Sequence, residues 1–300
     1  MAFINHILSY PVAGLVKLLS WLPLRVLHGI ATVLAFLMAD VIRYRRGVVL
    51  SNLRSAFPGK GEKELRRIAR GFYRHLADVV AETIKLLNIS DEEMMRRCRI
   101  SDEGKAMLRE YYSSGRSIIG LLGHFGNWEW VPPVTSLNFP FLVVPAYRPL
   151  KDKVMDRLML KIRGRYAHEL VPKKQVGRAT VRYQRGESPF IIGLIADQTP
   201  HPQVAYWTTF LSQDTPVFSG PEKLARSMRL PVFFVALRRQ RRGHYLMHVV
   251  LMTDDAAGMK EGELSRQFMA LLEQEIIRSP GDWLWSHRRW KHRRPENGQQ

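Results

Sequence analysis

The chain has 300 residues, of which 46% are hydrophobic, enough to build one large domain or two small ones. The single cysteine, Cys98, excludes an internal disulfide and any metal site built from several cysteines. The formal net charge of +19 points to polyanionic partners such as nucleic acid, anionic lipid headgroups or an acidic carrier protein, and a solubilising surface charge is the alternative.

The first forty residues are apolar but interrupted by prolines, histidines and charges. The run GIATVLAFLMA, between His28 and Asp40, would span about 16 Å as a helix, against about 30 Å of bilayer hydrocarbon. A window from Leu18 to Ile42 is long enough if Arg25 snorkels to the interface. The sequence leaves open an anchor helix, a monotopic hairpin in one leaflet, or two core helices of a soluble domain, and it disfavours a signal peptide because RYRR follows the apolar part.

The next segment predicts an amphipathic helix. FPGKGEKEL reads as a turn that leads into it, and apolar residues then recur at helical spacing, namely Leu65, Ile68, Phe72 and Leu76. The arginines between them are expected to face water or anionic lipid: Arg66, Arg67, Arg70 and Arg74. Basic flanks of this kind favour the cytoplasmic side of a membrane.

Beyond residue 114, short apolar runs alternate with helical segments. The candidate strands are SIIGLL (117–122), FLVVPAY (141–147), HELVP (168–172), PFIIGLIA (189–196), PVFFVAL (231–237) and YLMHVVL (245–251). The candidate helices cover 151–166, 177–184, 221–228 and 263–278. This alternation predicts an α/β fold with a mainly parallel central sheet flanked by helices. We therefore expect a membrane-associating helical region over 1–45 and one α/β domain over 46–300.

The stretch GHFGNWEW places polar chemistry beside bulky aromatics at the end of the first candidate strand. His124 follows that strand directly, at the sheet edge where α/β proteins build their sites. Glu129, five residues further on, is placed to hydrogen-bond the imidazole and make it a general base, and a structural pairing is the alternative. Phe125, Trp128 and Trp130 are candidate walls of a dry groove.

Several common catalytic signatures are absent from the sequence. It contains no HExxH motif, no G-x-S-x-G elbow and no P-loop, so serine nucleophiles and zinc hydrolysis are unsupported. We expect no metal site. Near the end, WLWSHRRWKHRRP interleaves tryptophans with basic side chains, which favours a membrane surface or a lipid headgroup. The mixture also suits single-stranded nucleic acid, but no nucleic-acid-binding module accompanies it.

HFGNWE, AYRPL, ADQTP, TTFLSQDTPVFSGPEKLA and WLWSHRRWKHRRP together resemble the late acyltransferases of lipid A biosynthesis. These are the lauroyl and myristoyl transferase group of the glycerolipid acyltransferase superfamily, and the resemblance runs in the same order over most of the chain. It implies transfer of a fatty acyl group from an acyl carrier protein thioester to a hydroxyl of a lipid A precursor, at the cytoplasmic face of the inner membrane. It implies no cofactor beyond that co-substrate.

The resemblance implies that His124 is the catalytic base and Glu129 its carboxylate partner. Arg148 stands in the second block of the pattern, and Asp197 and Gln198 stand in a later one. Following predicted strands, these three are expected at the same sheet edge as His124. Arg148 suits either the developing oxyanion or an acceptor phosphate, whereas Asp197 either supports catalysis or only caps a loop.

Two further candidates are less specific. Trp128 would contact the substrate as a groove wall, and Arg163 is a second phosphate candidate whose alternative is a solvated helix arginine. The sequence departs from the better-known pattern where TTFLSQDTPVFSG replaces a shorter stretch. An O-acyltransferase acting on a lysophospholipid or an aminolipid therefore stays open. The non-enzymatic alternative is a basic protein that binds a membrane surface or nucleic acid, although nucleic acid is not the partner we expect.

Overall fold

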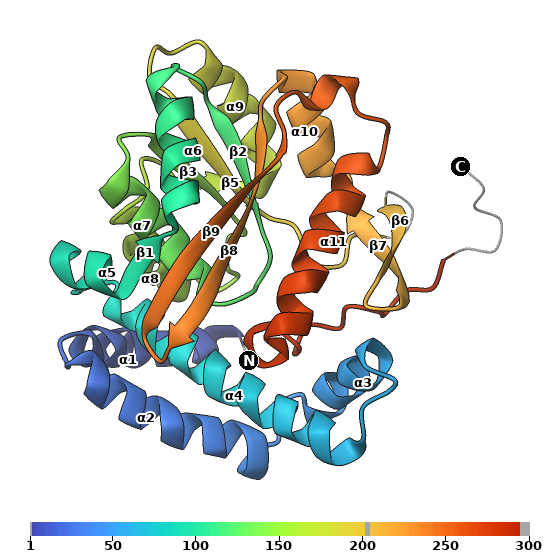
Figure 1. Cartoon of the computed structure of the whole chain (residues 1–300). Coiled ribbons are helices and arrows are strands. Elements are labelled where there is room, and N and C mark those ends of the chain that lie inside the picture. Colours follow the sequence, from blue (N-terminus) through green and yellow to red (C-terminus); the bar gives the residue numbers. More distant parts are fainter. Residues whose placement is uncertain (1, 202–204, 295–300) are drawn as a thin grey trace.

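The computed structural model describes residues 2–201 and 205–294. At its centre lies a seven-stranded sheet in the order β1-β9-β8-β2-β5-β3-β4 (Figure 1). Its strands are β1 (Cys98–Ile100), β2 (Ile118–Leu122), β3 (Leu142–Tyr147), β4 (Val171–Pro172), β5 (Phe190–Ile195), β8 (Val232–Arg241) and β9 (His244–Thr253). Neighbouring strands run parallel except β8 and β9, which form an antiparallel hairpin. The predicted α/β fold with a mainly parallel sheet is confirmed.

Helices cover both faces of the sheet, which is why its strands are nearly continuous apolar runs. One apolar core joins it to α5 (Asp91–Arg97), α6 (Asp102–Ser113), α7 (Val131–Asn138) and α8 (Lys153–Gly164). The other core joins it to α9 (Val176–Gln184), α10 (Gly220–Met228) and α11 (Glu263–Arg278). The three layers are visible in Figure 1. The four predicted helices agree with α8 to α11 within two residues at each end.

Three parts of the sheet region differ from the sequence prediction. The short edge strand β1 lies in a stretch for which the sequence predicts no strand. Of the predicted strand 168–172, only Val171 and Pro172 pair, at an edge of the sheet where a proline can be accommodated. An unpredicted antiparallel hairpin forms from β6 (Ala205–Phe210) and β7 (Gln213–Phe218). Its turn residues, Leu211 and Ser212, both have positive φ. Turns of this kind usually carry Asn-Gly, and this turn lacks that sequence signal.

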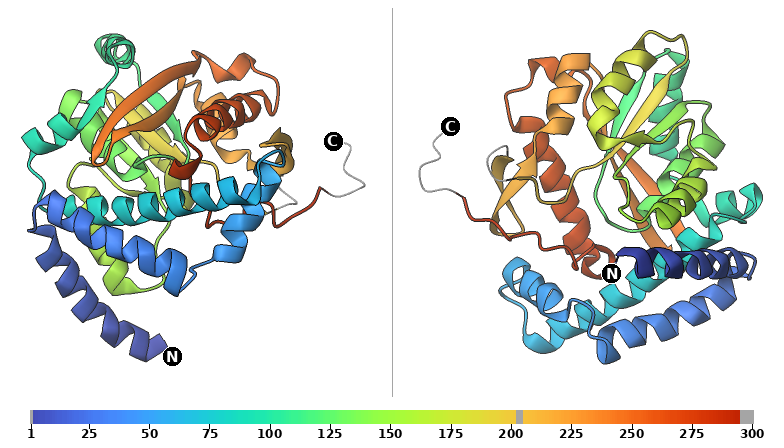
Figure 2. Two further views of the ribbon diagram at one scale, coloured as in Figure 1. Left: turned by 60° about the horizontal axis from the view of Figure 1, so that its bottom comes forward. Right: turned by 180° about the vertical axis from the view of Figure 1, so that it is seen from behind.

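The amino-terminal helices pack along the body of the protein. These are α1 (Ala2–Ser20) and α2 (Leu24–Phe36), and the latter continues as a π-helical turn over Leu37–Val41. α2 lies against α4 (Glu62–Lys85) (Figure 2), and α3 (Arg46–Ala56) connects the two. On α4 the predicted residues Leu65, Ile68 and Phe72 are buried, Leu76 is partly buried, and the four arginines are exposed.

A buried carboxylate ties α2 to the loop that follows β2. Glu82 on α4 is fully buried and lies 2.9 Å from His28 Nε2 on α2. It accepts hydrogen bonds of 2.6 Å from the side-chain amide of Asn127 and 2.8 Å from the hydroxyl of Tyr245. Burial and the carboxylate raise the pKa of Tyr245 well above its usual value, which keeps this hydroxyl a donor. The four side chains come from four separate elements, so this contact fixes their relative positions.

Gly126, in the loop after β2, lies against the backbone of a neighbouring strand and leaves no room for a side chain. Its φ is +58°, and a Cβ there would lie 1.7 Å from the backbone oxygen of Leu237. We predict that Gly126→Ala lowers the free energy of unfolding by about 2–4 kcal/mol, measured by urea denaturation. The control is Gly47→Ala in α3, where no heavy atom would lie within 4 Å of the new methyl group. Equal stability of the two variants would contradict the prediction.

Candidate active site

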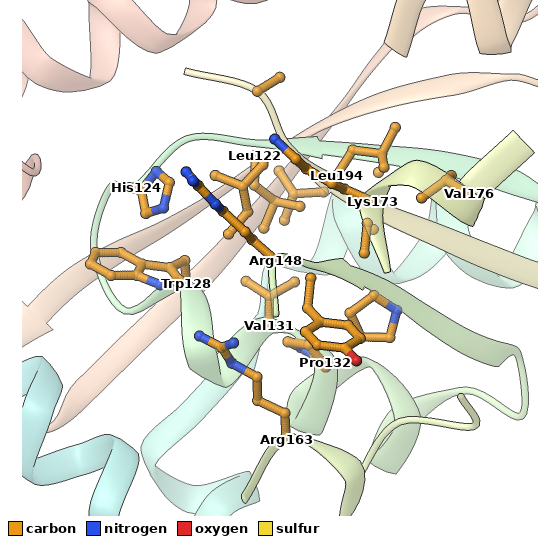
Figure 3. A pocket seen from close by; sticks show the side chains of 18 of the residues that line it. Leu122, His124, Trp128, Val131, Pro132, Arg148, Arg163, Lys173, Val176 and Leu194 are labelled. Atoms are coloured by element: carbon orange, nitrogen blue, oxygen red, sulfur yellow. The ribbon is translucent and has the colours of Figure 1, made fainter. Parts of the chain in front are cut away.

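A cavity of about 1070 Å³ lies between the sheet and the layer of α6, α7 and α8. Its interior is apolar and is floored by alternate residues of the strands, among them Ile118 and Leu122 of β2. Its mouth lies at the carboxyl ends of the strands, where His124 follows β2 and Arg148 follows β3 (Figure 3). Gln198, which follows β5, also lines the mouth. The volume is at the upper end of the range for small-molecule sites.

His124 is paired with Asp197 across the mouth of the cavity. β2 and β5 are parallel neighbours in which Leu122 is the register partner of Ile195, so the residues beyond the two strand ends meet. His124 Nδ1 lies 2.6 Å from Asp197 Oδ1, and the backbone N–H of His124 donates to Oδ2 at 2.8 Å. Gly123, which precedes His124, leaves room for the side chain of Leu272, because a Cβ at this position would lie 2.6 Å from it. The structure thus brings two predicted site residues together.

The electrostatics of the pair suit a general base. Burial disfavours the imidazolium, but the charge and hydrogen bond of Asp197 outweigh it, so the pKa of His124 is raised above 6.5. Burial opposes ionisation of Asp197 too, yet the imidazole and the other donors hold the pKa of that carboxyl below its usual value. With Nδ1 engaged by Asp197, the Nε2 of neutral His124 is left as the proton acceptor at the cavity.

The carboxyl-terminal segment completes the support of this pair. The indole N–H of Trp283 donates to Asp197 Oδ2 at 2.8 Å, and the backbone N–H of Leu284 donates to the carbonyl of His124 at 3.1 Å. Trp283 and Trp285 are only 2% and 0% exposed. The sequence prediction that this tail lies on a membrane or a headgroup therefore fails for these two tryptophans, because they pack into the core. Sequence reasoning gave Trp283 no role in the site.

Glu129 is placed differently from the sequence expectation. The chain makes one 3₁₀ turn at Trp128–Trp130 and then enters α7. The carboxylate of Glu129 accepts a bidentate pair of hydrogen bonds from Arg163, at 2.8 and 2.6 Å, and a third from the indole of Trp128 at 3.1 Å. The carboxylate bonded to His124 is thus Asp197, and Glu129 acts on the imidazole only through its charge, which raises the pKa of His124 less than Asp197 does. The catalytic role of Glu129 stays a prediction.

The other predicted site residues differ in how closely they approach the imidazole. Trp128 packs edge-to-face against His124, with ring centroids 5.1 Å apart. The amide nitrogen of Gln198 lies 3.5 Å from His124 Nε2, the limit of a hydrogen bond. Arg148 is exposed and extends over the mouth towards His124 (Figure 3). It makes no ion pair with any described residue, whereas Arg163 is occupied by Glu129.

Only Trp128 of the three predicted aromatic walls lines the cavity. Phe125 and Trp130 are buried in the two cores instead. Three further cations line the mouth, namely Lys151, Lys173 and Lys291. Lys291 belongs to the basic tail for which the sequence predicts a membrane surface or a headgroup, whereas Lys151 and Lys173 lie among many surface charges and carry no such signal. Among the described residues, no group of three or more His, Cys, Asp or Glu side chains is arranged to hold a metal ion.

Comparison with known proteins shows the family of this chain. The profile of the family described as "Bacterial lipid A biosynthesis acyltransferase" matches residues 3–292. The lipid A biosynthesis palmitoleoyltransferase of Escherichia coli (strain K12) is 22% identical over 285 residues, covering 93% of this chain and 90% of the relative. The lauroyltransferase of the same organism is 22% identical, with 93% and 90% covered, and a lipid A biosynthesis acyltransferase of Haemophilus influenzae is 24% identical, with 84% and 79% covered. The chain belongs to the bacterial lipid A biosynthesis acyltransferase family.

Proposed function

We propose that this acyltransferase moves a fatty acyl chain from an acyl carrier protein thioester to a hydroxyl of a lipid A precursor, with His124 as general base. One observation carries the proposal. A buried carboxylate holds Nδ1 of an imidazole whose Nε2 faces a cavity with a polar mouth and an apolar interior. An acyl chain needs such an interior, and its thioester needs the base beside it.

The reaction follows from this arrangement. Nε2 of His124 removes the proton as the acceptor's hydroxyl oxygen attacks the thioester carbonyl carbon, and a tetrahedral oxyanion forms. The intermediate collapses with cleavage of the carbon–sulfur bond, and the imidazolium returns the proton to the departing thiolate. Asp197 stabilises the transient imidazolium. Arg148 is available either to stabilise the oxyanion or to bind an acceptor phosphate, and Glu129 assists by fixing Arg163 and Trp128.

The charge at the mouth supports anionic substrates. Four exposed cations surround the opening: Arg148, Lys151, Lys173 and Lys291. Both an acidic carrier protein and a phosphorylated glycolipid would be attracted to this rim, and the apolar interior lies beneath it. The rim therefore supports both partners, and the reaction needs no metal or organic cofactor besides the thioester.

The amino-terminal helices support placement at the cytoplasmic face of the inner membrane without crossing it. The segment Leu24–Val41 is long and apolar enough to span a bilayer. One of its faces is packed on α4 through Leu24, Leu27 and Ala31, and the opposite face exposes Val26, Ile30, Val33 and Phe36. A spanning helix could not keep its contacts with the charged helix α4, whereas a helix lying in the interface keeps them and buries its apolar face in one leaflet. Neighbouring exposed arginines suit anionic lipids.

Loss of the base should abolish turnover. We predict that His124→Ala lowers acylation of a lipid A precursor by about 10²-fold or more in membranes supplied with an acyl carrier protein thioester. Parallel assays with a coenzyme A thioester, and with a lysophospholipid as acceptor, identify the donor and the acceptor. His244→Ala, at the first residue of β9 and outside the cavity lining, is the control that keeps activity. Acylation by His124→Ala at the wild-type rate would remove the proposed base.

The two carboxylates should differ in their effect on the pH profile. Neutral imidazole is the active form, so activity falls as the pH drops through the pKa of His124, which lies above 6.5. Asp197→Asn removes the charge that raises this pKa, so the acidic limb of kcat/KM should move to lower pH while the maximum falls about 10²-fold. Glu129→Gln should lower activity with a smaller displacement of the limb. A larger displacement in Glu129→Gln would instead make Glu129 the partner that the sequence spacing predicts.

The membrane geometry can be tested with single cysteines. Lys17→Cys and Arg66→Cys are exposed and lie on either side of the Leu24–Val41 segment, and the native Cys98 is buried. We predict that a membrane-impermeant maleimide labels both positions in inverted inner-membrane vesicles and neither in intact spheroplasts. Labelling of the two positions from opposite sides would show that the segment crosses the membrane. Protection of both until detergent is added would show that the body is embedded more deeply than proposed.

A further inference from the structure

Two glycines lie side by side in the floor of the cavity. Gly120 on β2 and Gly193 on β5 are register partners in the two neighbouring strands at the centre of the sheet. Both line the cavity. Glycine weakens a strand, and in a strand interior it marks a bulge or the close approach of another group. The ladder between β2 and β5 is regular through this pair, so a bulge does not explain it.

The protein's own packing does not require glycine at either position. Neither residue has a positive φ. A Cβ at Gly120 would lie 3.8 Å from methyl groups of Ile191 and Val235, and one at Gly193 would lie 3.6 Å from Cα of Pro145. These are ordinary van der Waals distances. A methyl group therefore fits without displacing neighbours, and what it takes up is space in the cavity. This contrasts with Gly126, where an added Cβ meets a backbone oxygen.

The two glycines lie deep in the cavity, where the part of an acyl chain far from its reacting carbonyl would lie. Gly120 is two residues, or about 7 Å, inside the carboxyl end of β2, and His124 follows two residues after that end. The cavity continues past the pair to Ile118, Phe233 and Met247, and it crosses from β5 through β2 and β8 to β9. Neighbouring strands are about 4.8 Å apart, so this crossing covers about 14 Å. On the opposite side the cavity is closed by Leu108 of α6.

We propose that Gly120 and Gly193 set the length of the fatty acyl chain that the enzyme transfers. Because neither residue has a side chain, the cavity is deeper where the distal part of the acyl chain crosses the sheet. This inference rests on the proposed function and adds its specificity-determining residues. A side chain at either position would project into the cavity in the path of the acyl chain. Long acyl chains would then no longer fit, whereas short acyl chains would end before they reach the added side chain.

The test uses variants with a graded increase in volume. Gly120→Ala, Gly120→Val and Gly193→Ala are assayed with a ladder of saturated acyl carrier protein thioesters from decanoyl to palmitoyl. Each added methyl group should cost the longest donor used by the wild type about 10-fold or more in kcat/KM. Donors shorter by two or more carbons should stay within about threefold of wild type, so the preferred length shifts downward. Gly47→Ala should leave the profile unchanged.

The outcomes separate this inference from the function on which it rests. If the wild type transfers no chain of any length to the lipid A precursor, the proposed function fails. If the wild type is active but the variants keep its chain-length profile, or lose activity equally for all donors, the assignment of the two glycines is overturned and the function stands. Because the alanine variants add only one methyl group, they test the proposal even if Gly120→Val fails to fold. Mass spectrometry of lipid A from cells expressing each variant gives a second reading of the transferred chain.

Discussion

The carboxylate of Asp197 accepts hydrogen bonds from the imidazole of His124, from the backbone N–H of the same residue and from the indole of Trp283. It is 2% exposed, and a buried anion is tolerated only where donors surround it. These donors come from the end of β2 and from the segment after α11, while the carboxylate itself follows β5. Satisfying one charge therefore gathers three distant parts of the chain and leaves the reactive nitrogen of His124 facing the cavity.

The parallel sheet explains why a polar pair and an apolar cavity adjoin. Strands buried on both faces are apolar throughout, and polar residues are tolerated only where they end. A cavity that lies against the sheet is therefore lined by apolar side chains, and its opening at the carboxyl ends of the strands is lined by polar ones. In this protein two neighbouring glycines also enlarge the cavity, and they do so without backbone strain. The same sheet thus positions both the imidazole of His124 and the apolar cavity beside it.

Local patterns predicted the longer strands of the central sheet, the helices of the second half and the placement of His124, because each depends on periodicity or on strand ends. The carboxylate partner was not predictable in this way. Glu129 is close in sequence, whereas Asp197 is 73 positions away and becomes a neighbour only through the pairing of β2 with β5. Tryptophans beside arginines likewise resemble an interfacial tail, and only the fold shows Trp283 and Trp285 filling the core. The β6–β7 hairpin was not predicted because its turn lacks glycine.

The contact of His28 with Glu82 has a consequence for how the protein can be handled. Removing the first two helices to obtain a soluble fragment would take away one partner of a fully buried carboxylate whose other oxygen holds Asn127, next to Trp128, which lines the cavity. It would also uncover the apolar side of α4 that α2 covers. The amino-terminal segment is in this respect an integral part of the fold and not a separable membrane anchor. Detergent extraction of the whole chain therefore suits purification better than truncation.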